Sequence, residues 1–85
     1  MIILSRRKPS VEFELAVLNV LAPGGQLTFS QLLREAELGG WATRIAISYL
    51  DSRGLIVPSH DHKRWRITRT GHAMLARHVT EGGRA

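Results

Sequence analysis

The chain has 85 residues, of which 44% are hydrophobic and 22% are charged, a composition that predicts one small folded domain with a single core. It contains no cysteine, which excludes disulfides, thiolate metal sites and thiol catalysis. The formal net charge is +5, with +3 over residues 1–8, −3 over residues 9–52 and +5 over residues 53–85, and this asymmetry favours a polyanionic partner such as nucleic acid.

The first residues, MIILSRRKPS, place a short apolar stretch before a basic group, which is the reverse of the order in a secretory signal. No apolar run approaches the length of a membrane span. We therefore expect a soluble cytoplasmic protein with no membrane partner. Residues 1–9 are expected to form a basic arm, in which Arg6, Arg7 and Lys8 would become ordered on binding a partner.

The first predicted helix lies in the stretch SVEFELAVLNVLA, which repeats apolar residues at positions 11, 15, 18 and 22. This spacing is typical of one helix face. Ser10 is a candidate N-cap, and the sequence PGG that begins at Pro23 ends the helix.

A second helix is predicted to begin at Phe29, because Thr28 and Gln31 have the spacing of a capping box. Gly39 and Gly40 would end this helix within about three turns.

The third predicted helix spans residues 41–53. Thr43, Ile47 and Leu50 repeat at helical spacing and are expected to face the core, and Gly54 supplies a left-handed C-cap.

After Gly54 the pattern becomes that of strands. LIVP is a short apolar run closed by a proline, and RWRIT alternates cations with apolar residues, so Trp65 and Ile67 would face the core while Arg64 and Arg66 face outward. Residues 59–63 would form the loop of this β-hairpin. Thr68 can cap a last helix.

The side chains of that last helix that can pack are those of Ala73, Leu75, Ala76 and Val79. Residues 81–85 are expected to be a flexible tail.

This order of elements resembles the winged-helix transcriptional regulators of the MarR and PadR kind. The resemblance is carried by LAVLNVLAPGGQLTFSQLL and, more strongly, by YLDSRGLIVPSHDHKRWRITRTGHAML. It implies an α+β winged helix-turn-helix domain over residues 10–80, with a three-helix core, a two-stranded hairpin wing and a C-terminal helix.

The function that the resemblance implies is binding of double-stranded DNA by a small transcriptional regulator. The helix of residues 41–53 would enter the major groove, and the wing of residues 57–66 would contact the adjacent backbone or minor groove. The same fold also serves in protein–protein contacts, so an interaction module with an acidic protein partner is the alternative. One such domain contacts few base pairs, which favours a homodimer.

The candidate DNA contacts are Thr28, Ser30, Gln31, Trp41, Arg44, Ile45, Ser48, Tyr49, His60, His62, Lys63, Arg64, Arg66 and Arg69. Arg44 could bond a guanine edge with both arms of its guanidinium group, or it could be a solvated helix cation. Trp41 lies on the outer face of its helix, but its residue type favours core packing. Thr28 and Gln31 either contact phosphate or serve as caps.

His60 and His62 could share a metal ion, but further ligands would have to come from another element. We therefore expect no metal and no cofactor, and place these histidines at the wing tip. Histidine gains a proton below about pH 6.5, which there would add positive charge and tighten polyanion binding. No carboxylate pair, catalytic triad or phosphate-binding loop stands out, so we do not expect an enzyme.

Overall fold

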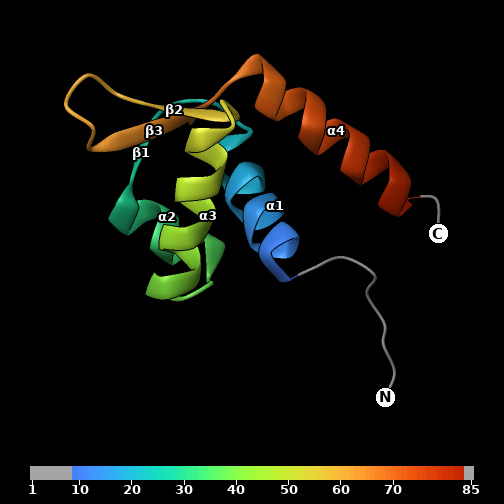
Figure 1. Ribbon diagram of the computed structural model, residues 1–85, viewed down its shortest axis with the longest axis horizontal. Helices are drawn as coiled ribbons and strands as arrows, with labels where there is room; N and C mark the ends of the chain where they lie inside the picture. Colours follow the sequence, from blue (N-terminus) through green and yellow to red (C-terminus); the bar gives the residue numbers. More distant parts are fainter. Residues whose placement is uncertain (1–8, 84–85) are drawn as a thin grey trace.

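The computed structural model describes residues 9–83, with side chains from residue 11 to residue 78, and shows an α+β fold. The elements in chain order are α1 (Pro9–Leu21), β1 (Leu27–Thr28), α2 (Phe29–Ala36), α3 (Gly40–Ser52), β2 (Ile56–Pro58), β3 (Arg64–Ile67) and α4 (Arg69–Gly83). Figure 1 shows the hairpin of β2 and β3 and the free end of α4 extending to opposite sides of α1, α2 and α3.

The first helix begins one residue before its expected cap. Pro9 is already helical, so Ser10 lies inside α1 and is not its N-cap. Proline is well suited to the first turn of a helix, because its backbone angle is already fixed near the helical value and the missing N–H would have no helical partner there.

The second helix begins at Phe29 as predicted, but ends earlier than expected. The Thr28 hydroxyl accepts a hydrogen bond from the backbone N–H of Gln31 at 3.2 Å, and the Gln31 side chain accepts one from the backbone N–H of Thr28 at 2.8 Å. The C-cap is Glu37, in the left-handed conformation with φ of 54°. The expected terminator Gly39 instead precedes α3 as its N-cap.

The sheet has three strands, whereas the sequence predicts two. Its order is β1-β3-β2, and both pairings are antiparallel. The unexpected strand is the two-residue β1, in which Leu27 pairs with Trp65 and Thr28 pairs with Arg64. A strand this short carries no alternation that could be recognised, and its partner lies far along the chain.

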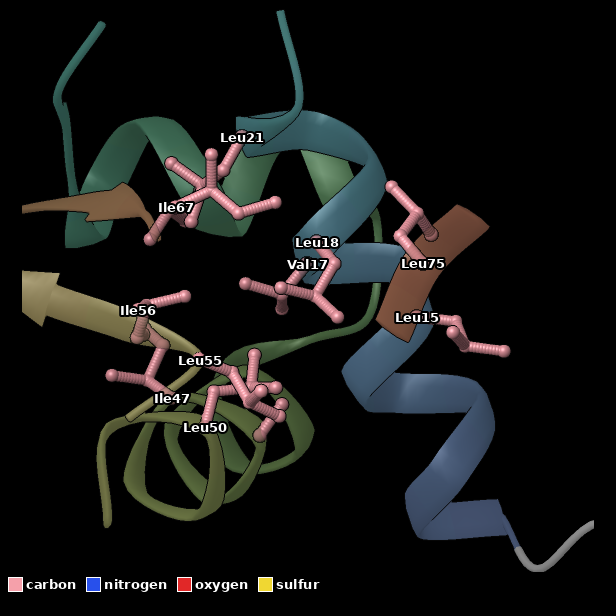
Figure 2. Close-up of a cluster of buried hydrophobic side chains, with 12 residues drawn as sticks. Leu15, Val17, Leu18, Leu21, Ile47, Leu50, Leu55, Ile56, Ile67 and Leu75 are labelled. Carbon is pink, nitrogen blue, oxygen red and sulfur yellow. The ribbon is translucent and has the colours of Figure 1, made fainter. Parts of the chain in front are cut away.

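The core forms where the inner faces of α1 and α3 meet the base of the sheet (Figure 2). Helix α1 contributes Leu15, Val17, Leu18 and Leu21. Thr43, Ile47 and Leu50 are buried as the helical spacing predicts. Burying one such aliphatic side chain contributes about 1.5–3 kcal/mol, so these contacts fix which face of α3 remains outside.

The last helix is capped by Thr68 as predicted, since the backbone N–H of Gly71 donates to the Thr68 hydroxyl at 3.0 Å. Leu75 packs on the core, but Ala73 and Ala76 are exposed, contrary to expectation. The side chain of Val79 lies outside the described residues. Helix α4 continues to Gly83, past the expected domain boundary at residue 80 and into the expected tail of residues 81–85.

Candidate nucleic-acid interface

The outer face of α3 presents a polar and aromatic surface. Arg44 and Ser48 are exposed, Ile45 is half-buried, and 48% of Tyr49 is exposed. Ile45, Ser48, Tyr49 and Ser52 line a shallow open depression along this face. The opposite face packs on α1, so these side chains remain available to a partner.

Trp41 lies on this outer face, with 73% of its side chain exposed, so the expectation of core packing was wrong. The neighbouring residues Ala42 and Thr43 are buried. Each helical residue advances the face by about 100°, which turns Trp41 away from the core that Thr43 enters. The position on the helix therefore overrides the general preference of tryptophan for burial.

Arg44 lies over an aromatic ring that belongs to another helix. Its guanidinium carbon lies 4.9 Å from the centroid of the Phe29 ring, at the start of α2. This distance is within the range of a cation–π interaction. Arg44 is therefore neither buried nor freely solvated, and Phe29 is a partner that sequence analysis did not single out.

The far end of α3 is fixed by an ion pair to α1. Nη1 of Arg53 donates to Oε1 of Glu14 at 3.2 Å, and the exposed fractions of the two side chains are 53% and 3%. A buried carboxylate needs a charged partner, and Arg53 supplies one from the end of the candidate recognition helix. The guanidinium carbon of Arg53 also lies 5.8 Å from the Tyr49 ring centroid. Neither Glu14 nor Arg53 was among the candidate site residues.

The start of α2 lies beside the sheet. The polar atoms of Thr28 and Gln31 form the capping box, and Ser30 is exposed on the first turn. Capping engages the Thr28 oxygen and the Gln31 carbonyl as acceptors, so the hydroxyl proton and the amide N–H groups remain able to donate to a phosphate. The structural role and the proposed contact are therefore compatible.

The hairpin wing has the alternation that the sequence predicts. Arg64 and Arg66 are exposed, Ile67 is buried and Trp65 is half-buried. The buried indole N–H of Trp65 has no hydrogen-bond partner among the described residues. The apolar side of β3 thus anchors the wing and leaves its cations outside, with Lys63 at the tip and Arg69 at the start of α4 also exposed.

The wing tip, residues 59–63, is organised by Asp61. Its Oδ1 atom accepts hydrogen bonds from the hydroxyl of Ser59 and from the backbone N–H of Lys63. The Ser59 hydroxyl in turn accepts from the backbone N–H of Arg64 at 3.2 Å. His62 has a left-handed backbone with φ of 61°, which this network holds in place.

The same network lowers the pKa of Asp61 below its ordinary value of 3.8, chiefly through the hydrogen bond from Ser59 and next through that from the Lys63 amide. The nearby charges of Arg64 and Lys63 act in the same direction. Asp61 is therefore an anion at neutral pH, and it offsets part of the positive charge at the tip. The spacing of Ser59 and Asp61, two residues apart, is a sequence feature that could have indicated a hydrogen bond between them. The full set of hydrogen bonds, however, is defined only by the folded loop.

His60 and His62 are both exposed at the tip. Among residues 9–83, no group of three or more histidine, aspartate or glutamate side chains is placed to hold a metal ion. None of the described helices combines the length and the apolar character that crossing a bilayer requires. The expected basic arm of Arg6, Arg7 and Lys8 lies outside the described residues.

Two contacts connect the outer face of α3 to the wing. Arg44 lies over Phe29, and the residue before Phe29 is Thr28, which pairs with Arg64 in the sheet. Arg44 is therefore linked, through the Phe29 ring and the chain, to the strand β1 that pairs with the wing. We use the name α3–wing surface for the exposed residues Arg44 and Ser48 of α3 together with Lys63, Arg64 and Arg66 of the wing.

Comparison with known proteins identifies a shared fold. No protein-family model and no curated protein matches the chain. A solved structure of BpsR from Bordetella bronchiseptica, a protein whose DNA binding is regulated by 6-hydroxynicotinic acid, superposes with a TM-score of 0.75 at 22% sequence identity. The match covers 89% of this chain and 60% of the BpsR chain, so the protein shares the fold of BpsR over somewhat more than half of that chain's length.

Proposed function

We propose that the protein binds double-stranded DNA as a small transcriptional regulator and catalyses no reaction. Helix α3 would enter the major groove, and the hairpin wing would contact the adjacent backbone or minor groove. The observation that carries the proposal is the α3–wing surface, in which Arg44 lies over the ring of Phe29, and the residue before Phe29, Thr28, pairs with Arg64. The fold shared with BpsR, which binds DNA, is independent support.

The residues of α3 divide into different kinds of contact. The guanidinium group of Arg44 carries in-plane N–H donors that match O6 and N7 of guanine, and a bidentate pair of this kind discriminates by about 1–3 kcal/mol. Ser48 can donate to a base or a phosphate, and Ile45 can meet a thymine methyl group. Base reading would thus depend chiefly on Arg44.

The wing would supply affinity that does not depend on sequence. Lys63, Arg64 and Arg66 are exposed on a hairpin whose other face is anchored by Ile67. Cations that neutralise phosphates release counterions, which strengthens binding to any duplex and makes it depend on salt. Thr28, Ser30 and Gln31 would add phosphate contacts at the start of α2.

A symmetric homodimer is the working form that we propose. One recognition helix contacts only a few base pairs, whereas two related helices read two half-sites about one helical turn apart. A dimer would therefore raise specificity without any new type of contact.

A second function is favoured by the exposed aromatic residues of α3. Trp41 and Tyr49 are the large hydrophobic side chains that remain exposed in the described chain, and such residues are common in the centres of protein interfaces. An interaction module that binds an acidic protein would use them together with the cations. In that case Trp41→Ala would abolish partner binding, while duplex DNA would not be retained at moderate salt.

The test of DNA binding compares Arg44→Ala with Arg64→Ala. Fluorescence anisotropy would measure the affinities for a duplex enriched by the wild-type protein from a random pool and for its single-base-pair variants. We expect Arg44→Ala to reduce discrimination at one or two positions by about 5- to 150-fold, the equivalent of about 1–3 kcal/mol. Arg64→Ala should weaken binding to all duplexes alike.

The matched control is Arg77→Ala, which removes an exposed cation from α4 and should leave both affinity and discrimination near the wild-type values. The proposed division of roles is contradicted if Arg44→Ala and Arg64→Ala change the affinities for the enriched duplex and its single-base-pair variants in the same way.

A further inference from the structure

We propose that Phe29, the first residue of α2, determines base specificity by holding the guanidinium group of Arg44 in position. The inference rests on the proposed function, because it concerns how Arg44 reads a base. Its basis is the contact between the two residues, in which the guanidinium carbon lies 4.9 Å from the ring centroid. Phe29 itself need not touch DNA.

The geometry of a stacked arginine explains why such a contact would help recognition. Stacking on a ring uses the flat face of the guanidinium group, whereas all of its N–H donors lie in the plane and point outward. A guanidinium group stacked in this way on the Phe29 ring would keep free the edge that pairs with guanine. An unrestrained arginine loses side-chain conformational entropy when it binds a base. Contact with the Phe29 ring would already restrict the Arg44 side chain in the free protein, so less entropy would be lost on binding DNA.

Phe29 is a firm support for this purpose. Its ring is half-buried and packs against the hydrophobic core, and its backbone follows the capping residue Thr28. Thr28 also pairs with Arg64 in the sheet. The ring is therefore held from the core side and from the wing side, and its position relative to the wing is fixed.

Removal of the Phe29 ring would change DNA binding in opposite directions, depending on whether the ring presents Arg44 to the base or holds it away. If Arg44 had to leave the ring to reach a base, the stack would compete with DNA, and removal of the ring would tighten binding. If the stack presents the guanidinium edge, removal of the ring weakens discrimination at the base that Arg44 reads, with little change elsewhere.

The experiment uses Phe29→Leu, which keeps apolar volume but removes the ring, and Phe29→Tyr, which keeps the ring. Each is made in the wild-type chain and in the Arg44→Ala chain, and affinities are measured for the enriched duplex and its single-base-pair variants. We expect Phe29→Leu to reduce discrimination at the Arg44-dependent position by about two- to fivefold, which corresponds to an exposed cation–π contact. Phe29→Tyr should retain wild-type discrimination.

In the Arg44→Ala chain, Phe29→Leu should have no further effect on discrimination, because the residue through which it acts is missing. Thermal unfolding would show whether the variants remain folded. Without DNA, NMR should show a ring-current shift of the Arg44 side-chain N–H signals that disappears in Phe29→Leu and persists in Phe29→Tyr.

Three results would overturn the inference. The first is unchanged or improved discrimination in Phe29→Leu while Arg44→Ala loses it. The second is an equal loss of discrimination in the wild-type and Arg44→Ala backgrounds, which would show that Phe29 acts on the fold and not through Arg44. The third is the failure of the wild-type chain to bind any duplex, which would also overturn the proposed function, whereas the first two results would leave that function standing.

Discussion

Gly71 illustrates how a single residue constrains the contact between the sheet and α4. A β-carbon at this position would lie 2.2 Å from the carbonyl oxygen of Leu55 and 2.8 Å from Cγ1 of Ile67. A backbone oxygen cannot move aside without disturbing the segment that enters β2. The glycine is therefore required because α4 and this segment approach closely, and not because of its backbone angle.

We accordingly predict that Gly71→Ala lowers the free energy of unfolding by about 1–3 kcal/mol, the usual cost of forcing extra atoms into a packed site. For a domain of this size each kcal/mol corresponds to about 4–8 °C in Tm, which differential scanning calorimetry can measure. Gly40→Ala is the control, because a β-carbon there meets nothing within 4 Å. Equal melting temperatures for the two variants would contradict the packing that we describe.

Other residues show what a sequence pattern can and cannot predict at this scale. The burial of Thr43 and the exposure of Arg64 follow from helix and strand periodicity, and the structure confirms both. The exposure of Trp41 also follows from the helix face, but the general preference of tryptophan for burial outweighed it in our prediction. The stack of Arg44 on Phe29 joins residues from two helices, and no local pattern indicates it.

At the scale of elements, the wing tip is a small hydrogen-bonded unit centred on Asp61. Because the pKa of Asp61 in the folded chain is below 3.8, the ionised carboxylate stabilises the loop at every pH above its ordinary pKa. This stabilisation is lost as the pH falls below 3.8 through the lower folded value. The tip should thus keep its shape over the whole neutral and mildly acidic range.

We predict that Ser59→Ala raises the pKa of Asp61 toward 3.8, because the Ser59 hydrogen bond is the main cause of the lowered value. A ¹³C NMR titration of the Asp61 carboxyl group would measure the change. Lys63→Gln is the control, since it keeps the backbone N–H that bonds Asp61 and removes only a minor charge effect. If Lys63→Gln raised the pKa as much as Ser59→Ala, charge and not hydrogen bonding would dominate.

The elements themselves were predictable where they carry a strong local signal. The capping box of Thr28 and Gln31 fixed the start of α2, and Gly54, with φ of 75°, marks the end of α3 as predicted. The start of α1, the end of α2 and strand β1 were missed. The end of α2 depends on Glu37 in the left-handed conformation, which non-glycine residues rarely adopt, and β1 exists only because β3 lies beside it.

At the scale of the whole molecule, positive charge is concentrated in the segments at the two ends of the sequence, and folding brings part of it to the exposed wing. The segment 53–85 has a net charge of +5 and the segment 9–52 a net charge of −3. In the folded chain Arg44 of the second segment lies over the Phe29 ring, and the preceding residue Thr28 pairs with the wing cation Arg64 of the first segment. The basic composition was readable from the sequence, whereas this juxtaposition required the third strand and the Phe29 stack.

The α3–wing surface leads to a prediction for the salt dependence of duplex binding. Each phosphate contact contributes about 0.9 to the slope of log affinity against log salt concentration. If Lys63, Arg64 and Arg66 each contact one phosphate, one chain should give a slope of magnitude about 3 and a symmetric dimer about 5 to 6. Fluorescence anisotropy over a salt series would measure the slope, and sedimentation velocity would measure the number of chains on each duplex.

Charge-matched variants separate this surface from the general basicity of the chain. Arg64→Gln should lower the magnitude of the slope by about 1 per chain. Arg77→Gln removes the same charge from α4, the helix whose free end extends to the side opposite the wing, and should leave the slope unchanged. Because both variants have the same net charge, a difference between them can arise only from where the cation lies. Equal slopes for the two variants, or a wild-type slope below about 1, would show that the wing does not contact the phosphate backbone.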